Sequence, residues 1–468
     1  MSEGPTTIGD MSDEALKKAQ QKMADAGVHR TAVDVFGHYY RELEAGATGL
    51  IHEDEISPMT EPTMFEDVEI DEAQAREALG RTVVIKLNGG LGTSMGMTKA
   101  KSLLPVRDGK SFLDLIVAQV LAARAEYDAP LPLLLMNSFN TREDTLAALE
   151  AYPELRVGDL PLDFVQSQEP KLRTDDLTAV EWPADPRLEW CPPGHGDLYP
   201  SLLSSGVLDA LLDAGFRYAT VSNSDNLGAA PDATIAGWFA ASGAPYAAEV
   251  CRRTPMDRKG GHLAVRKSDG QLILRETAQT APEEMDYFTD EHRHPYFHTN
   301  NLWFDLQRLA EVLRERDGVL GLPLIRNVKT VDPKDSDSPE VFQIESAMGA
   351  AVEVFEGATA ICVPRTRFLP VKTTNELLLL RSDAYEVTDS GHLHLLPESA
   401  PTIELDPTYY KKIGDFEKRF PEGAPSLRQA TSFTVEGDWT FGSDVVVEGR
   451  GILDDAGEPR TVADGTTI

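Results

Sequence analysis

Hydrophobic and polar positions alternate with two different periods along the chain. Apolar residues fall at helical spacing at Ala32, Val35, Phe36 and Tyr39–Tyr40, which predicts a helix in the N-terminal segment. From Thr82 to Leu87 the residues are mostly β-branched or aliphatic, and the run ends in Asn88-Gly89-Gly90, which predicts a buried strand that breaks into a loop. Beyond it, helices are expected over 112–124, after Asn140 with Thr141 as cap, and over 202–214 and 374–385, and strands over 131–136, 162–165 and 216–222.

This alternation of strands and helices with short connections predicts an α/β fold with a mostly parallel sheet. Three regions are expected: an N-terminal helical segment over 1–80, a central α/β domain over 81–386 and a C-terminal domain over 387–468. Residues 53–72 are acidic and contain two prolines, so they are interpreted as a surface linker. In the C-terminal region a Val-Glu-Gly triplet recurs after twelve residues, at Val435 and Val447, which favours short strands stacked in coils.

Composition limits the possible partners. The 468 residues include 77 Asp and Glu against 44 Lys and Arg, a formal net charge of −33, so nucleic acid and anionic membranes are not expected partners. A hydrophobic content of 41% is enough for a sizeable core. No secretory signal is expected at Met1–Pro5, no apolar run is long enough to span a membrane, and three scattered cysteines do not form a disulfide framework. A cytoplasmic location is therefore expected.

A glycine-rich segment, Leu87 to Ser102, is the strongest local signal for a ligand. Four glycines in eight positions after a strand let the backbone approach a phosphate closely. The spacing matches neither the dinucleotide fingerprint nor the Walker motif. Six basic residues and one acidic residue lie between Arg81 and Lys110, an unusual excess in so acidic a chain. A tight turn without a ligand is the alternative interpretation.

Three further segments carry polar chemistry. Asp225 follows a strand in Ser222 to Gly228, where a carboxylate can hold Mg²⁺ or simply cap a turn. Pro192 to Asp197 presents Gly-His-Gly in a rigid loop, and Arg365 to Thr374 holds three cations and no acid, which favours anion binding over a basic turn before a helix. His292, His294 and His298 are not expected to bind zinc, since cysteines are missing and Pro295 interrupts the spacing. The N-terminal segment is interpreted as a solvated helical wrapper without chemistry.

These segments, in this order, resemble the eukaryotic-type UTP–glucose-1-phosphate uridylyltransferase family. The resemblance extends from about Thr82 to Gly451, with further matches at Leu135 to Thr141 and Thr299 to Trp303. It implies a nucleotide-diphospho-sugar transferase domain with a Rossmann-like mixed sheet, followed by a left-handed β-helix. The implied reaction converts UTP and glucose 1-phosphate into UDP-glucose and pyrophosphate with Mg²⁺ as cofactor, in a monomer or a small homo-oligomer joined through the C-terminal domain.

The resemblance also implies roles for individual residues. Lys101 and Lys372 are the implied catalytic lysines that contact phosphates, and Asp225 is the implied Mg²⁺ ligand. The implied substrate-binding residues are Leu87, Asn88, Gly89, Gly90, Gln166 and Gly194 for the nucleotide, His195 and Gly196 near the join between nucleotide and sugar phosphate, Asn223 beside ribose and sugar, and Glu276 and Asn300 for glucose hydroxyls.

Two alternatives stay open at this point. The same chemistry could serve a broader range of sugar 1-phosphates, because sugar choice depends on a few hydroxyl contacts. The chain could also be a non-catalytic nucleotide-sugar binding protein, although Lys101, Asp225 and Lys372 together speak against a decayed site.

Overall fold

The protein is described here from a computed structural model, which covers residues 8–468, with side chains from residue 12 onward. The segment Met1–Pro5, where no secretory signal is expected, lies outside the described residues. Two compact units make up the chain. Unit 1 holds Met1–Ile85, Gly158–Val221 and Ala233–Val363, and unit 2 holds Lys86–Val157, Ser222–Asp232 and Pro364–Ile468. Each unit is described by itself.

A mixed sheet forms the core of unit 1, as expected for an α/β fold. Its strand order is β2 (Thr63–Met64), β18 (Thr359–Cys362), β12 (Tyr246–Arg252), β15 (Tyr296–Asp305), β11 (Tyr218–Asn223) and β3 (Thr82–Asn88). The strand β18 runs parallel to β2 and to β12, whereas β15 runs antiparallel to β12 and to β11. The sheet is therefore mixed, and the mostly parallel arrangement predicted from the alternation applies to only part of it.

The helices of unit 1 correct one prediction. The expected helix over 202–214 is two helices, α6 (Leu198–Ser204) and α7 (Val207–Asp213). Gly206 separates them with φ +76°, a conformation that glycine adopts without strain. The other helices of this unit are α3 (Glu72–Gly80), α8 (Ala233–Ser242), α9 (Met285–Phe288) and α10 (Leu306–Glu315).

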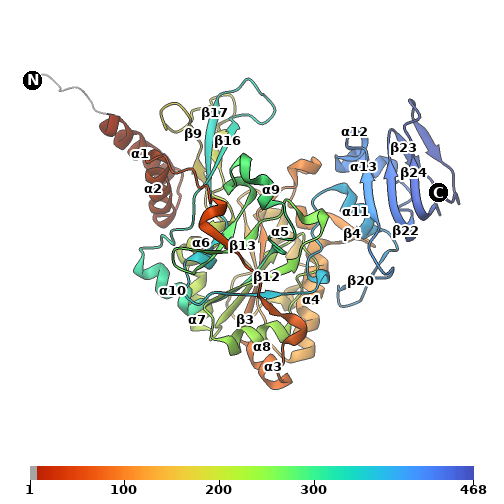
Figure 1. Ribbon diagram of the computed structural model, residues 1–468, viewed down its shortest axis with the longest axis horizontal. Coiled ribbons are helices and arrows are strands. Elements are labelled where there is room, and N and C mark those ends of the chain that lie inside the picture. The colour runs from red at the N-terminus through yellow and green to blue at the C-terminus, as the bar shows by residue number, and fades with distance from the viewer. Residues whose placement is uncertain (1–7) are drawn as a thin grey trace, which may run out of the picture. The chain divides into compact units, whose positions relative to one another are not determined.

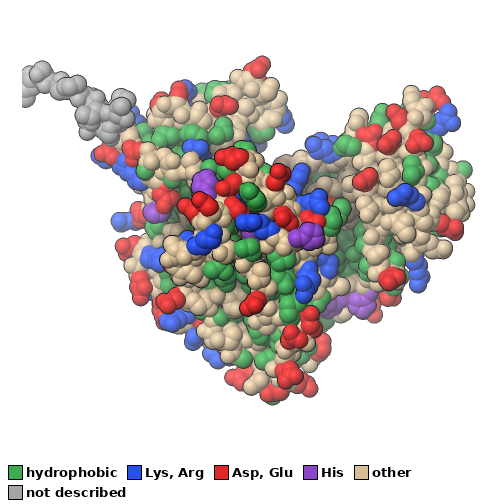
Figure 2. Space-filling model, in the orientation of Figure 1, with side chains coloured by type: hydrophobic (Ala, Val, Ile, Leu, Met, Phe, Trp, Pro, Cys, Tyr) green, Lys and Arg blue, Asp and Glu red, His purple; other side chains and the backbone are tan. Residues whose placement is uncertain are grey.

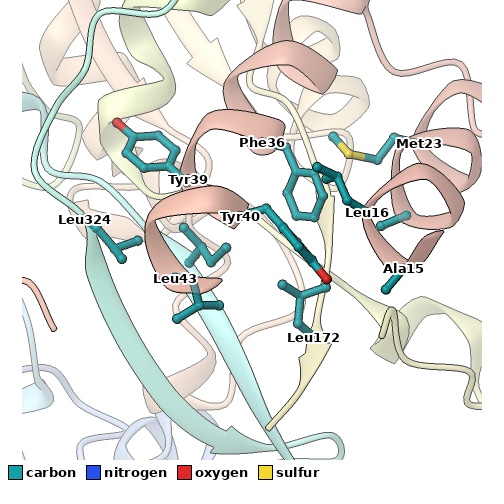
Figure 3. Packing of buried hydrophobic residues seen from close by; sticks show 11 residues of the cluster. Ala15, Leu16, Met23, Phe36, Tyr39, Tyr40, Leu43, Leu172 and Leu324 are labelled. Carbon is teal, nitrogen blue, oxygen red and sulfur yellow. The ribbon is translucent and has the colours of Figure 1, made fainter. Parts of the chain in front are cut away.

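Two N-terminal helices, α1 (Ile8–Asp25) and α2 (Arg30–Glu44), pack side by side (Figure 1). The helical spacing predicted around Phe36 is confirmed. Figure 3 shows the Tyr40 ring between Phe36 and Leu172, while the Tyr39 hydroxyl points away from the labelled residues of this cluster. The Tyr39 hydroxyl forms a side-chain hydrogen bond with Ser346. The helices are thus part of the folded core of unit 1 rather than a loose wrapper.

The segment over 53–72 is not the surface linker expected from its composition. The strand β1 (Ile56–Pro58) pairs antiparallel with β13 (His262–Arg266), and β2 is an edge strand of the mixed sheet. Glu53 is only 6% exposed, and its carboxylate lies 2.5 Å from the buried Arg275 guanidinium and pairs with Arg293. The acidic composition here serves buried ion pairs as well as the surface.

The remaining short strands of unit 1 form small sheets outside the mixed sheet. They are β8 (Glu169–Pro170), β9 (Leu172–Arg173), β10 (Trp190–Cys191), β14 (Leu272–Arg275), β16 (Ile325–Thr330) and β17 (Glu340–Glu345), whereas the short strand β7 (Asp163–Val165) is an edge strand of the mixed sheet. The strand β17 lies between β16 and β9, and β10 pairs with β8.

In unit 2, α4 (Phe112–Tyr127) and β6 (Leu133–Asn137) match their predictions closely. The helix α5 (Arg142–Leu149) begins after Thr141 as expected, but the Thr141 hydroxyl accepts from Ser138 N at 3.0 Å and does not cap the helix. The helix α11 (Thr374–Arg381) stops four residues short of its predicted end, and β19 (Tyr385–Val387) follows. The hairpin partners are β20 (Leu393–Leu395) for β19 and β5 (Lys110–Ser111) for β4 (Pro105–Arg107).

Parallel strands stack in the C-terminal part of unit 2, which supports the expectation of coils. The strand β22 (Ser426–Val435) pairs in parallel with β21 (Thr402–Leu405) and with β24 (Val446–Leu453), and β23 (Trp439–Phe441) pairs in parallel with β25 (Arg460–Val462) (Figure 1). The helices α12 (Pro407–Tyr410) and α13 (Ile413–Arg419) lie between β21 and β22 in the sequence.

The triplet spacing of twelve residues is not the period of these coils. Phe433 stands opposite Gly451, eighteen positions later, and Trp439 stands opposite Arg460, twenty-one positions later. The two Val-Glu-Gly triplets are therefore not paired with each other. Stacked parallel strands were predicted correctly, but the twelve-residue spacing on which that prediction rested is not the repeat of the coils.

Figure 2 shows Asp and Glu side chains scattered over the visible face, with Lys and Arg side chains among them. Among residues 8–468, none of the helices combines the length and the apolar character that a membrane span requires.

Candidate active site

The glycine-rich segment closes into a loop within unit 2. Lys101 N donates to Gly90 O at 3.1 Å, so the two ends of the loop meet. Gly92 has φ +63°, and its carbonyl accepts from Met95 N at 2.9 Å to start a 3₁₀ turn. A Cβ on Gly92 would come within 2.9 Å of the Met97 sulfur. Positive φ and close packing together explain why glycine stands here.

The base of this loop is fixed by neighbouring elements. Asn88 is 2% exposed and donates from Nδ2 to Asn137 Oδ1 at 2.7 Å and to Thr145 Oγ1 at 3.0 Å. Its Oδ1 is buried and has no hydrogen-bond partner among the described residues. Ser138 Oγ donates to Gly89 O at 3.0 Å. The end of β3 is thus rigid and offers one buried acceptor.

Lys101 and Asp225 form an ion pair, with Nζ 2.6 Å from Oδ2. The two side chains are only 16% and 18% exposed. Lys101 Nζ also donates to the carbonyl oxygen of Val371, and Val371 N donates to Asp225 O at 3.2 Å. Three segments that are far apart in the sequence therefore meet at one point. Asp225 Oδ1 is buried without a hydrogen-bond partner among the described residues.

The turn that carries Asp225 is tied to β3. Ser224 N donates to Leu87 O at 3.1 Å, and Asn223 O accepts from Asn226 N at 3.2 Å. Leu87 and Asn223 are half-buried at the ends of their strands. The unit 2 residues predicted as site residues, from Leu87 to Gly90 with Lys101, Asn223 and Asp225, therefore belong to one cluster.

Lys372 is exposed and lines a cavity of about 230 Å³ together with Ser94 and Met95 of the glycine-rich loop. Lys411 lines the same cavity. Because Lys372 follows Val371, whose carbonyl receives Lys101, both predicted catalytic lysines approach the same loop.

Part of the positive charge predicted to bind anions has a structural role instead. Arg367 is 8% exposed and donates from Nη1 to Ala230 O at 3.1 Å. Arg107 donates to the carbonyls of Tyr385 and Leu380, and buried Lys86 donates to Ser222 Oγ at 2.7 Å. The number of basic side chains along the sequence is therefore larger than the number available to bind an anionic ligand.

In unit 1, the loop of Gly194, His195 and Gly196 packs directly against Ser346. Gly196 N donates to Ser346 O at 2.8 Å, and Ser346 N donates to Pro193 O at 3.1 Å. A Cβ on Gly194 would lie 2.5 Å from Ser346 O, and one on Gly196 would lie 2.3 Å from Ser346 Oγ. Both glycines are required by this contact.

His195 is fixed in one tautomer. Its Nδ1 accepts from Met348 N at 2.9 Å, so in the neutral ring the proton sits on Nε2. Burial lowers the pKa of His195 to about 4, because desolvation disfavours the imidazolium. Met348 O in turn accepts from the Tyr199 hydroxyl at 2.7 Å. His195 is therefore a neutral hydrogen-bond donor at physiological pH.

Gln166 lies one residue before a contact to this loop. Ser167 N donates to Asp197 Oδ2 at 2.5 Å, and Ser201 Oγ donates to the same oxygen at 2.8 Å. Burial raises the pKa of Asp197 to about 6. The structure thus brings Gln166, Gly194, His195 and Gly196 into one part of unit 1.

Glu276 and Asn300 lie near one another through Gly261 and His298. His298 N donates to Gly261 O at 2.8 Å, and a Cβ on Gly261 would lie 2.5 Å from Glu276 Oε2. Asn300 has φ +63°, uncommon for a residue with a side chain, and its N donates to His298 Nδ1 at 3.2 Å. Glu276 also caps the 3₁₀ turn Thr277–Gln279 with its carboxylate.

The chemistry of the unit 2 cluster fits Mg²⁺. Mg²⁺ is usually held by one or two carboxylates together with substrate phosphates. Asp225 offers a buried oxygen without a protein partner among the described residues, beside a loop suited to phosphate. Within the described part of the chain, no group of three or more His, Cys, Asp or Glu side chains is arranged to hold a metal by itself.

Sequence reasoning missed the backbone groups that orient these side chains. Met348 N fixes the ring of His195, and Val371 O receives Lys101. Main-chain donors and acceptors leave no mark in residue type, so no local signal was available. The histidine cluster His292, His294 and His298 does not act as a unit, because His298 lies beside Asn300, whereas His294 pairs with Glu53 elsewhere in unit 1.

The family model and the curated relatives that match this chain carry the same family name. The sequence model of the UTP–glucose-1-phosphate uridylyltransferase family matches residues 33–448. The UTP–glucose-1-phosphate uridylyltransferase of Solanum tuberosum is 41% identical over 421 residues, covering 89% of this chain and 84% of the relative. A probable enzyme of the same name from Schizosaccharomyces pombe is 37% identical, covering 95% and 86%.

Solved structures agree with the sequence comparisons. A UDP-glucose phosphorylase from Trypanosoma brucei superposes with a TM-score of 0.88 at 42% identity, over 97% of this chain and 98% of that one. A mutant UDP-glucose pyrophosphorylase from Leishmania major in complex with UDP-glucose gives a TM-score of 0.90 at 41% identity, over 97% and 98%. With its glycine-rich loop, its lysine–aspartate pair and these relatives, the chain belongs to the UTP–glucose-1-phosphate uridylyltransferase family.

Proposed function

We propose that this chain transfers UMP from UTP to glucose 1-phosphate, which gives UDP-glucose and pyrophosphate. Family membership over residues 33–448 supports this reaction, as do relatives of that name at about 41% identity. The single structural observation that carries the proposal is the Lys101–Asp225 ion pair. Lys101 Nζ lies 2.6 Å from Asp225 Oδ2, and Lys101 stands where the glycine-rich loop closes.

The reaction needs positioning and charge neutralisation more than covalent help. A phosphate oxygen of glucose 1-phosphate attacks the α-phosphorus of UTP in line, the new P–O bond forms, and the bond to pyrophosphate breaks. Two polyanions must be brought together, and the negative charge on the leaving pyrophosphate must be stabilised. Lysine ammonium groups and backbone N–H groups supply that stabilisation in unit 2.

Lys101 and Lys372 are the proposed catalytic cations. Lys101 is held by Asp225 and Val371 O before substrate arrives, so its ammonium is oriented in advance. Lys372 lines the cavity beside Ser94 and Met95 and is exposed to incoming phosphate. Asp225 would hold Mg²⁺ through its unpartnered Oδ1. Bound Mg²⁺ supplies charge neutralisation at the phosphate oxygens.

The proposed uridine contacts are described for each unit by itself. In unit 2, the backbone of Leu87, Gly89 and Gly90 and the buried Oδ1 of Asn88 offer hydrogen bonds to a base or ribose. In unit 1, Gln166 and Gly194 are the proposed uracil contacts, and the Gly194 backbone is held in place because Ser346 O lies 2.5 Å from where its Cβ would be.

Five further residues are the proposed contacts of the sugar phosphate: His195, Gly196, Asn223, Glu276 and Asn300. Neutral His195 is proposed to donate from Nε2, and the buried Gly196, packed against Ser346, holds the loop beside it. Asn223 is proposed to contact ribose and sugar, and Glu276 and Asn300 are proposed to contact glucose hydroxyls. The adjacency of Glu276 and Asn300 around Gly261 supports that assignment.

Finer points of architecture also remain proposals. We propose that the stacked C-terminal strands wind as a left-handed β-helix, on a catalytic domain over 81–386 of the nucleotide-diphospho-sugar transferase type. Parallel pairing at β22–β24 and β23–β25 supports the coil. A monomer or a small homo-oligomer joined through this region is proposed, and Ile452, which is 53% exposed on β24, is an apolar contact that such a pair would bury. Light scattering distinguishes the two states.

A cytoplasmic location is proposed from the cysteines. Cys191, Cys251 and Cys362 are all buried cysteines outside any disulfide, as a reducing compartment favours. No nucleic acid or membrane partner is proposed, since the net charge is −33.

The reaction is tested by coupled detection of pyrophosphate with UTP, Mg²⁺ and a panel of sugar 1-phosphates. Release that requires glucose 1-phosphate supports the proposal. Comparable release with galactose 1-phosphate would instead favour an enzyme with a broader sugar range. No release with any sugar, together with measurable binding of UDP-glucose, would favour a non-catalytic binding protein.

A further inference from the structure

His298 presents an unused hydrogen-bond donor in unit 1. The residue is 7% exposed, and its Nδ1 accepts from Asn300 N at 3.2 Å. The proton of the neutral ring therefore sits on Nε2. That atom is buried and has no hydrogen-bond partner among the described residues. Buried donors are nearly always paired, so an unpaired one calls for an explanation.

The ring of His298 faces the same backbone turn that orients His195. A Cβ on Gly349 would lie 2.7 Å from His298 Cε1 and 3.0 Å from Nε2, so the ring rests against this glycine. The preceding residue, Met348, donates to His195 Nδ1 at 2.9 Å. The two imidazoles thus flank the Met348–Gly349 turn, and in each ring Nδ1 is occupied by a backbone N–H.

The turn between the two rings is held rigidly. The Tyr199 hydroxyl donates to Met348 O at 2.7 Å, and the Tyr246 hydroxyl donates to Gly349 O at 3.3 Å. Both tyrosines are fully buried. Burial also lowers the pKa of His298 to about 4, so its ring is neutral at physiological pH.

The neighbours of His298 are the residues proposed to contact the sugar. Asn300 N donates to His298 Nδ1, and His298 N donates to Gly261 O at 2.8 Å. The Glu276 carboxylate packs against the same Gly261. Glu276 accepts hydrogen bonds, whereas His298 Nε2 donates one. A hydroxyl-rich ligand needs both kinds of group.

We infer that His298 is a specificity-determining residue that donates from Nε2 to an acceptor oxygen of the sugar 1-phosphate. The inference deepens the proposed function and rests on it, because it names a residue that selects the second substrate of that reaction. The acceptor is either a sugar hydroxyl or a phosphate oxygen, which share the same chemistry toward a neutral N–H.

Two substitutions separate this role from packing. In His298→Asn, a side-chain oxygen near the old Nδ1 position can still accept from Asn300 N, but the outer donor is lost. In His298→Gln, an amide NH₂ reaches toward the old Nε2 position. His392→Asn is the control, since His392 is a half-buried histidine of unit 2.

We expect His298→Asn to raise KM for glucose 1-phosphate about tenfold, the scale of one lost hydrogen bond, while KM for UTP changes less than twofold. His298→Gln should recover part of this loss, and His392→Asn should behave as wild type. If the acceptor is a sugar hydroxyl, the ratio of the Kd for UDP to the Kd for UDP-glucose should also fall in His298→Asn, whereas a phosphate acceptor, which UDP also carries, should weaken the binding of both. That ratio is insensitive to the fraction of folded protein, so it remains informative if the variant is less stable.

Deoxy analogues of glucose 1-phosphate identify the acceptor. If it is a hydroxyl, the effect of His298→Asn disappears for the one analogue that lacks it; if it is a phosphate oxygen, the effect persists for every analogue. An unchanged KM for glucose 1-phosphate and an unchanged Kd ratio in active His298→Asn would overturn the inference. A wild-type protein that forms no UDP-glucose would instead overturn the proposed function itself.

Discussion

Lys101 Nζ lies 2.6 Å from Asp225 Oδ2, so the proposed catalytic cation and the proposed metal ligand hold each other in place. The remaining carboxylate oxygen of Asp225 is buried without a partner among the described residues. One carboxylate can therefore orient the lysine and still offer an oxygen to a cation.

Replacing Asp225 with Asn should weaken the dependence on Mg²⁺. The amide keeps the shape of the side chain but carries no charge, so both its hold on Mg²⁺ and its pairing with Lys101 decrease. We expect at least a tenfold rise in the Mg²⁺ concentration for half-maximal activity, measured by titration at saturating substrates. Asp108→Asn, on an exposed turn of the same unit, is the control and should not change the titration. Identical Mg²⁺ curves for Asp225→Asn and wild type would remove Asp225 from the metal site.

Replacing Lys372 with Ala should lower turnover about 10²–10³-fold, the scale for removal of a preorganised group that stabilises transition-state charge. The lysine is exposed and lines the cavity beside Ser94, so the fold should be unaffected. Steady-state kinetics with both substrates saturating measures the loss, and Lys99→Ala, an exposed lysine of the same loop, is the matched control. Equal turnover in the two alanine variants would contradict the role of Lys372.

The stability contributed by His195 should fall as the solution becomes acidic. Burial lowers the pKa of His195 to about 4 in the folded chain, against an ordinary value near 6.5 in the unfolded chain. Between these values the unfolded chain takes up a proton that the folded chain refuses, so stability is lost as pH falls from about 6.5 toward 4. Relative to His195→Gln, the melting temperature of wild type should therefore decline between pH 7 and pH 5.

The exposed His394 gives the control for that experiment, because His394→Gln should parallel wild type at every pH. Because His195 stays neutral in the folded protein down to about pH 4, it should not titrate near pH 6.5. The pH profiles of activity for wild type and His195→Gln should therefore have the same shape around pH 6.5. A melting difference between wild type and His195→Gln that is independent of pH would show that His195 has the same pKa in the folded and the unfolded chain, which contradicts the prediction.

Replacing Gly196 with Ala should disrupt the His195 loop. Its Cβ would lie 2.3 Å from Ser346 Oγ and 2.8 Å from Leu322 Cδ1, closer than real contacts allow. We expect a loss of at least tenfold in activity and a destabilisation of about 1–3 kcal/mol, the usual cost of overpacking. Combining Gly196→Ala with Ser346→Gly removes part of the clash and should recover some stability in a denaturant titration. Wild-type stability of Gly196→Ala would mean that the loop does not pack on Ser346 in solution.

Local features of the sequence predicted the local features of the structure. The strand from Thr82 into a glycine turn, the helix around Phe36 and the strand before Asp225 follow from patterns within a few residues. The pairing of Lys101 with Asp225 spans 124 positions and was not predicted, because the resemblance implied a separate role for each residue. Backbone partners such as Met348 N carry no signal in residue type.

Errors arose where one residue or a distant partner decided the outcome. Gly206, with φ +76°, splits a helix that the hydrophobic pattern continues through. The acidic segment near Glu53 looks like a linker until the buried Arg275 is placed beside it, 222 positions away. The basic residues near Arg367 predicted an anion site, but Arg367 bonds to a backbone carbonyl instead. A count of charged residues does not show such backbone partners.

The central claim is that Lys101 stabilises the transfer of UMP to glucose 1-phosphate. It is tested most directly by rapid-quench measurement of UDP-glucose formation from saturating UTP, Mg²⁺ and glucose 1-phosphate. Wild type should form UDP-glucose and pyrophosphate in equal amounts, and Lys101→Ala should form them about 10²–10³-fold more slowly while still binding UDP-glucose. Formation by Lys101→Ala at the wild-type rate, or UDP-glucose formation by wild type without equimolar pyrophosphate, would contradict the claim.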